Sequence, residues 1–163
     1  MPAAVKVAAG WPIRSNERMW NFPGARRPGS TVPAGEWMQP KKILIVDDSK
    51  VAAMTQELIL RSLRGCEVIT AEDGIKGVEM AVAEQPDLIL MDVVMPRMNG
   101  FEACRLIRGH EATESIPIIM VTTRSESAHV DEGFASGCND YILKPIDAAE
   151  LLEKIHKLSD DAR

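Results

Sequence analysis

The sequence predicts an α/β fold in which one doubly wound, five-stranded parallel sheet occupies residues 41–159. Two observations predict it. Short apolar runs alternate with amphipathic stretches five times from Lys42 onward, and the runs have the continuous apolar character of strands that are buried on both faces. Strands that alternate with helices form a parallel sheet with helices on both sides. Ligands bind such sheets beyond the carboxyl ends of the strands, so we expect functional residues there.

The five predicted strands are short and rich in isoleucine, leucine and valine, which suits a sheet covered on both faces. They are KILIV (42–46), CEVIT (66–70), DLILM (87–91), IPIIMV (116–121) and DYIL (140–143).

The first two predicted helices are bounded by residues that begin or end helices. Ser49 is a suitable N-cap for a helix that runs to about Leu63, before Gly65. The second helix lies within residues 72–85 and is stopped by Pro86. Apolar residues at helical spacing are expected to face the core: Val51, Met54, Leu58 and Ile59 in the first helix, and Ile75, Val78 and Val82 in the second.

The other three helices follow from the same kinds of signal and are predicted at residues 100–109, 126–137 and 147–158. In the first of these, the inward residues are Phe101, Cys104 and either Leu106 or Ile107. Gly137 stops the next helix, and a capping box from Asp147 to Glu150 begins the last one.

The first 40 residues differ in composition from the rest. They hold all three tryptophans and six of the ten prolines, and they carry five basic but only two acidic residues. No helical or strand period is present, so we expect a disordered or loosely attached extension. Two alternatives stay open: Met38 is the true start of the protein, or residues 1–37 form a basic, aromatic arm that binds a partner.

Charge and hydropathy exclude several classes of protein. The remaining chain carries 14 basic and 22 acidic residues, which argues against a nucleic-acid-binding surface there. No apolar run approaches the roughly 20 residues that span a bilayer, and no signal-peptide pattern is present. We therefore expect a cytoplasmic protein without membrane insertion. Cys66, Cys104 and Cys138 form neither a CxxC pair nor a zinc pattern and are expected to be reduced thiols.

Three acidic residues are predicted to meet at one edge of the sheet. Asp47 and Asp48 follow the first strand and Asp92 follows the third, so their carboxylates converge if these strands are neighbours. Clustered carboxylates repel one another and need either raised pKa values or a cation. A few carboxylates with water and a phosphoryl oxygen suit Mg²⁺, although each acid alone is as readily explained as a turn or capping residue.

Thr122 and Lys144 follow the fourth and fifth strands and are expected at the same edge. A hydroxyl group binds the oxygens of an anion by hydrogen bonding, and an ammonium group binds them by charge. Taken alone, the threonine is an ordinary strand residue and the lysine an ordinary surface residue. Together with the acids they describe a phosphoryl-transfer site, in which a carboxylate attacks phosphorus while a metal ion and the lysine neutralise the phosphoryl oxygens.

This set of residues is similar to that of the receiver domain of two-component response regulators, over about residues 41–158. The likeness is carried by the acid pair in DDS after the first strand, an acceptor aspartate before VVMPRMNG, a threonine after the fourth strand and KP after the fifth. Five chemically distinct positions agree with the family's order. The resemblance implies the flavodoxin-like (βα)5 receiver fold.

The resemblance also implies a role for each matching residue. Asp92 would accept the phosphoryl group. Asp47 and Asp48 would hold Mg²⁺ together with Asp92 and the backbone carbonyl of Val94. Lys144 would pair with Asp92 and later bind a phosphoryl oxygen, and its bond to the following proline is expected to be cis.

Thr122 and Tyr141 would form the conformational switch of the family, with Thr122 moving toward the phosphoryl group as Tyr141 turns inward. The alternative for Tyr141 is an ordinary half-buried ring. Three neighbouring positions depart from the family's common pattern. Thr123 would narrow access to the phosphoryl group, Val94 cannot hydrogen-bond an attacking water, and Arg124 is a cation that would bind phosphoryl oxygens instead. We therefore predict slow self-hydrolysis of the phosphorylated protein.

The resemblance implies a single-domain response regulator of the chemotaxis or phosphorelay type, because no output domain follows residue 158. It would not be an enzyme with an external substrate. It would take a phosphoryl group on Asp92 from a histidine kinase or phosphotransfer protein and switch the binding of a downstream partner protein through about residues 124–158. The alternatives are a degenerate receiver that binds partners without phosphorylation, and a haloacid-dehalogenase-type phosphohydrolase, which requires an aspartate at the position of Val94.

Overall fold

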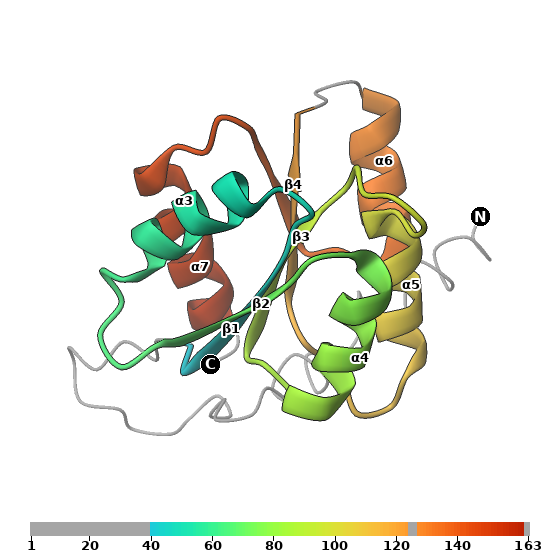
Figure 1. The fold of residues 1–163 in the computed structure, drawn as a ribbon, viewed down its shortest axis with the longest axis horizontal. Coiled ribbons are helices and arrows are strands. Elements are labelled where there is room, and N and C mark those ends of the chain that lie inside the picture. The colour runs from blue at the N-terminus through green and yellow to red at the C-terminus, as the bar shows by residue number, and fades with distance from the viewer. Residues whose placement is uncertain (1–39, 124–126, 162–163) are drawn as a thin grey trace.

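The computed structural model describes residues 40–123 and 127–161, which form one parallel sheet between two layers of helices (Figure 1). The strand order is β2-β1-β3-β4-β5. The strands are β1 Lys42–Val46, β2 Glu67–Ala71, β3 Leu88–Asp92, β4 Ile118–Thr122 and β5 Asp140–Leu143. The helices are α3 Lys50–Leu60, α4 Gly74–Glu84, α5 Gly100–Gly109, α6 Ser127–Ser136 and α7 Ala148–Asp161.

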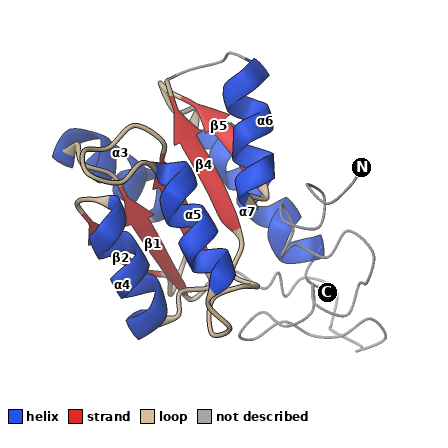
Figure 2. Ribbon diagram, turned by 90° about the vertical axis from the view of Figure 1, so that its right-hand side faces the viewer, coloured by secondary structure: helices blue, strands red, loops and turns tan. Residues whose placement is uncertain are grey.

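Each face of the sheet has its own core. Helices α3 and α7 cover one face, and α4, α5 and α6 cover the other (Figures 1 and 2). Successive side chains of a strand point to opposite faces, so Ile43 and Ile45 of β1 belong to the core under α3 and α7. Leu44 and Val46 belong to the core under α4 and α5. The continuous apolar runs of the strands are thus explained by burial on both sides.

Every predicted strand and helix is present, and β1 and β3 are neighbours as the acid cluster required. The bounds of β1, α5 and β5 are those predicted, while α3 ends earlier, at Leu60, and α7 ends later, at Asp161. Strands β3 and β4 each end one residue later than predicted. Asp92 and Thr122 are therefore the last residues of strands, where the ladder of the sheet fixes their backbone.

The predicted inward face of α3 is wrong for three of its four residues, whereas Ile59 is partly buried against the core, as predicted. Val51, Met54 and Leu58 are 75%, 62% and 60% exposed, and the buried residues are instead Ala53, Gln56 and Leu60. The two sets have the same spacing along the helix, so the hydrophobic period alone does not distinguish them. The structure buries the set that contains a small alanine and a glutamine, and the glutamine amide donates a hydrogen bond in the site described below.

In α4 the predicted inward face is wrong at Ile75 but right at Val78, which is partly buried and packs against the core, and Val82 is also partly buried. Ile75 is 42% exposed, whereas Gly74, Gly77 and Ala81 are buried. A Cβ atom on Gly77 would lie 2.7 Å from a methyl group of Val46, so the small residues allow α4 to approach β1 closely. In α5 the open choice is resolved in favour of Ile107, which is fully buried, while Leu106 is half exposed.

The predictions for residues 1–39 and for Arg124 lie outside the described residues. Within the described part of the chain, no helix combines the length and the apolar character needed to cross a membrane. The three cysteines are free thiols, as predicted, and Cys104 and Cys138 are buried.

Candidate functional site

The three predicted acids lie together at the carboxyl edge of the sheet. Asp47 follows β1 directly, and Asp92 ends β3, the neighbouring strand. Asp47 and Asp92 are buried and Asp48 is exposed. Each of the three offers a carboxylate oxygen, and these oxygens all lie within 4.8 Å of one another. The sequence placed them there correctly because neighbouring parallel strands end at the same edge.

Three donors hold the carboxylate of Asp47 in a single orientation. The backbone N–H of Ser49 donates to Oδ1 over 2.9 Å, while the Gln56 amide and the Lys144 ammonium donate to Oδ2 over 3.1 and 3.0 Å. The Ser49 side chain meanwhile caps α3 by accepting from the Ala52 N–H. The start of α3 is therefore tied to the site through Asp47.

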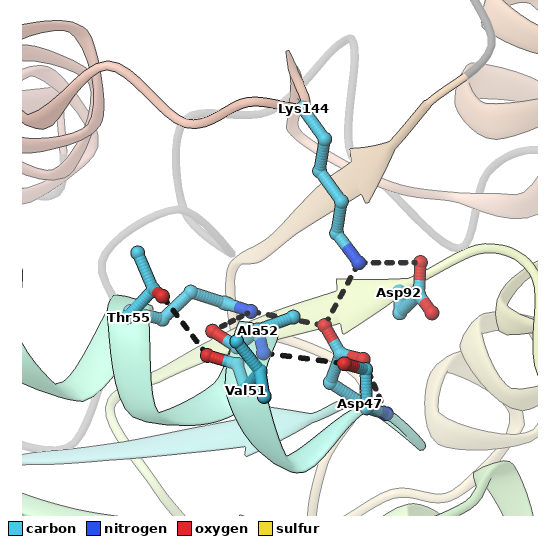
Figure 3. Close-up of polar contacts among 8 residues, drawn as sticks. Asp47, Val51, Ala52, Thr55, Asp92 and Lys144 are labelled. Atoms are coloured by element: carbon cyan, nitrogen blue, oxygen red, sulfur yellow. Dashed lines mark hydrogen bonds and ion pairs between the residues drawn. The ribbon is translucent and has the colours of Figure 1, made fainter.

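Lys144 reaches across the edge of the sheet from the end of β5 and lies between two of the acids (Figure 3). Its Nζ is 3.0 Å from Asp47 Oδ2 and 3.5 Å from Asp92 Oδ1. The expected ion pair with Asp92 is present, but the shorter contact is with Asp47, which sequence reasoning missed. The Lys144–Pro145 bond is cis, as expected. Burial lowers the pKa of Lys144, but the hydrogen bond and charge of Asp47 and the charge of Asp92 outweigh it, so the pKa is raised and the ammonium form is favoured.

The environment of Asp92 disfavours an unpartnered negative charge. Burial raises the pKa of Asp92 to about 6, the charge of Asp47 adds to the rise, and Lys144 opposes it. One ammonium group therefore does not compensate the whole cluster. A divalent cation held by the three carboxylates would complete the compensation, and hard oxygen ligands of this kind suit Mg²⁺. The residues present thus fit the predicted metal.

The loop after β3 is held close to the acids by two features, a glycine and an ion pair. A Cβ atom on Gly100 would lie 2.2 Å from the backbone oxygen of Asp92, so only glycine allows α5 to begin here. Arg97 forms an ion pair with Asp73, the N-cap of α4. Arg97 also has a positive φ of 67°. An arginine does not indicate this backbone conformation in a sequence, as a glycine would. Val94 lies in this loop with a half-exposed side chain, and its role as a metal ligand stays a prediction.

Thr122 lies on β4, the strand next to that of Asp92, and Tyr141 lies on β5, one strand further along the sheet. Thr122 is buried at the end of β4, and its backbone oxygen accepts from the Lys144 N–H over 2.7 Å. Tyr141 of β5 is half-buried, edge-on to Phe134 of α6 with ring centroids 6.1 Å apart. The Lys154 ammonium of α7 lies 5.8 Å from the centre of the same ring. The tyrosine therefore joins α6 to α7 across β5.

Comparisons with known proteins agree with this geometry. Protein PilH of Pseudomonas aeruginosa is 41% identical over 115 residues, which are 71% of this chain and 94% of PilH. The DNA-binding dual master transcriptional regulator RpaA of Synechocystis is 38% identical over 72% of this chain, but the match spans only 48% of RpaA. The receiver domain of the sensor histidine kinase PA1611 from P. aeruginosa, solved with magnesium in its active-site cleft, aligns with a TM-score of 0.68 and 35% identity, covering 74% of this chain and 98% of that domain.

The match to a known family is direct. Residues 43–156 match the response regulator receiver domain, and this range contains the acid cluster, Thr122, Tyr141 and Lys144. The chain therefore belongs to the response regulator receiver family of two-component signalling.

Proposed function

We propose that this receiver is a phosphorylation-controlled switch of the single-domain type in the cytoplasm. Asp92 accepts a phosphoryl group from a histidine kinase or phosphotransfer protein, and the change alters the binding of a downstream partner protein. The observation that carries the proposal is the contact of Lys144 with both Asp47 and Asp92 at the edge where the three carboxylates converge. The match to PilH covers 94% of PilH, so PilH consists of little more than a receiver domain.

The carboxylate of Asp92 is placed to act as the nucleophile. Its oxygen attacks the phosphorus of the phosphohistidine, the P–N bond breaks, and the imidazole of the donor leaves with the electron pair. Lys144 lies 3.5 Å from Asp92 Oδ1 and neutralises charge on the phosphoryl oxygens that arrive there. Such positioning and electrostatic stabilisation supply most of the catalysis of phosphoryl transfer.

Asp47, Asp48 and Asp92, with the backbone carbonyl of Val94, would hold Mg²⁺. When bound, the ion supplies positive charge to the transferred phosphoryl group. The arrangement of the cluster supports this assignment, since the Asp47 carboxylate is fixed by three hydrogen bonds and Asp48 is exposed to solvent.

Thr122 and Tyr141 change conformation in response to the phosphoryl group. Thr122 moves its hydroxyl toward the phosphoryl oxygens, and Tyr141 turns into the space that Thr122 leaves. Because Tyr141 contacts Phe134 of α6 and lies beside Lys154 of α7, its movement alters the surface made by α6, β5 and α7. A phosphoryl group with a few charge-assisted hydrogen bonds biases such a two-state element by a few kcal/mol.

Phosphate uptake by the full chain tests the proposal. We expect wild-type protein incubated with Mg²⁺ and acetyl phosphate to gain one phosphoryl group in its intact mass, and Asp92→Asn to gain none. Glu111→Gln, which changes an exposed acid away from the site, should behave as wild type. No uptake by the wild type would favour a receiver that binds partners without phosphorylation, and continuous turnover of a phosphoester would favour a phosphohydrolase.

A further inference from the structure

The side chain of Gln56 has no place in the mechanism above, yet it is one of the most deeply buried polar groups near the site. It is 1% exposed and lies on the core-facing side of α3 between Ala53 and Leu60. Its Nε2 donates to Asp47 Oδ2 over 3.1 Å and to the backbone oxygen of Ala52 over 3.3 Å. An amide therefore occupies a position where the rest of the helix face is apolar.

The packing of α3 does not explain this amide. Among the described residues no donor reaches Oε1 of Gln56, which is buried, and an unsatisfied buried carbonyl lowers the stability of a protein. A leucine or methionine would fill the same space without that loss. The benefit of glutamine must therefore lie at the group that it contacts, the Asp47 carboxylate.

Asp47 Oδ2 is shared by Gln56 and Lys144. The two donors differ in their other partners, because the Lys144 ammonium also lies 3.5 Å from a second carboxylate, that of Asp92. In the proposed function, Lys144 binds the phosphoryl oxygens that arrive at Asp92, which would weaken its contact with Asp47. Within the described part of the chain, Asp47 is the only acid to which Gln56 donates, so Gln56 continues to fix Oδ2. Its amide is neutral and does not repel a cation bound to the same carboxylate.

We propose that Gln56 is a positioning residue for the metal site: its amide, held on α3, keeps the Asp47 carboxylate oriented for Mg²⁺ whether or not Lys144 is bound to it. The inference rests on the proposed function, because it requires Asp47 to be a metal ligand. Partners that orient metal ligands in this way typically change metal affinity by 10–100-fold when they are removed.

Gln56→Met in the full chain tests the role, with Mg²⁺ binding followed by titration calorimetry. We expect the Kd for Mg²⁺ to rise about tenfold. In phosphorylation by acetyl phosphate, the Mg²⁺ concentration for half-maximal rate should rise by the same factor, while the rate at saturating Mg²⁺ stays within about threefold of wild type. Gln56→Leu provides a second apolar variant, and thermal unfolding without Mg²⁺ shows which variants are folded.

Thr113→Val is the matched control. Thr113 is fully buried and its hydroxyl donates to the Ile107 backbone oxygen over 2.7 Å, in the connection that precedes β4. Its loss should lower stability and leave the Kd for Mg²⁺ unchanged. If the folded Gln56 variants bind Mg²⁺ as tightly as wild type, or if Thr113→Val weakens binding equally, Gln56 is only structural and the inference is overturned. If the wild type binds no Mg²⁺, the proposed function itself fails.

Discussion

Asp92 is the residue whose chemistry depends most on its surroundings. Burial beneath the edge of the sheet, together with the charge of Asp47, raises its pKa from 3.8 to about 6. The folded protein therefore binds more protons than the unfolded chain between about pH 4 and pH 6, and the contribution of this group to stability falls as the pH rises through that window. An ionised Asp92 is useful as a nucleophile and costly to the fold.

The Asp92→Asn variant should show this cost. Without Mg²⁺ at pH 7.5, we expect the amide to raise the free energy of unfolding by about 1 kcal/mol, since solvent near the site screens part of the unfavourable charge. At pH 5 the gain should be smaller, because the folded wild type is then largely protonated at Asp92. Urea unfolding at both pH values measures the difference, and an equal gain at both would contradict the assignment.

Val94 is the residue expected to set the lifetime of the phosphorylated state. Its side chain is half exposed two positions after Asp92 and offers no hydrogen bond to an attacking water. We expect Val94→Asn to speed loss of the phosphoryl group by about tenfold, because an amide orients the water for attack. The decay of phosphoprotein after removal of the phosphodonor measures this, with Val94→Ala as the control. An unchanged lifetime in Val94→Asn would rule out this explanation.

At the scale of the element, α3 shows how little the hydrophobic period says about which side of a helix is buried. Leu58 is 60% exposed and Leu60 is fully buried. Leu60→Ala should lower the free energy of unfolding by about 2–5 kcal/mol because it leaves a cavity, whereas Leu58→Ala should change it by less than about 0.5 kcal/mol. Chemical denaturation of the two variants tests this orientation of α3. If the face with Leu58 were buried instead, Leu58→Ala would lower the free energy of unfolding more than Leu60→Ala.

Helix α5 offers a second matched pair, because glycine is its first and last residue. Gly100→Ala should lower the free energy of unfolding by about 2 kcal/mol or more, since the new methyl group meets the Asp92 backbone. Gly109→Ala meets nothing within 4 Å and should be neutral or stabilise by up to about 1 kcal/mol. Equal stabilities for the two variants would show that the loop after β3 can move away from Asp92.

At the scale of the whole molecule, the strand order makes the site and connects it to a surface. The acids, Thr122 and Lys144 lie at or directly after the ends of the neighbouring strands β1, β3, β4 and β5. Strand β5 also carries Tyr141, which contacts Phe134 of α6 and lies near Lys154 of α7. In the proposed switch, a change at Asp92 would reach α6 and α7 through Thr122 and Tyr141. Strand β2 forms the opposite edge of the sheet from β5.

Hydrogen exchange tests this direction of coupling. On phosphorylation by acetyl phosphate, we expect amide exchange to change in residues 127–158 and to change little in β2 and in the last turn of α4, which lie away from β5. Asp92→Asn treated in the same way should show no change. A response confined to the loop after β3 would contradict transmission through Tyr141.

The sequence by itself determined the architecture and the composition of the site. Apolar runs buried on both faces, separated by helices, permit few arrangements other than a doubly wound parallel sheet, and such a sheet gathers whatever follows its strands at one edge. Asp47, Asp48, Asp92, Thr122 and Lys144 were located in this way. The family motifs then supplied the roles that remain proposals for this chain.

Only the tertiary structure decided the phase of the helices and the pairing within the site. A period of 3.6 residues fixes the spacing of the buried residues of a helix but not which of two equally spaced sets is buried. Gln56 belongs to the buried set of α3, although the sequence predicted the other set to face the core. The partner of Lys144 lies 97 residues away in the chain, and a choice between Asp47 and Asp92 at distances of 3.0 and 3.5 Å depends on how the ends of β1, β3 and β5 are placed in three dimensions. Spacing along a chain carries local periodicity, whereas contacts of this kind exist only after the layers have packed.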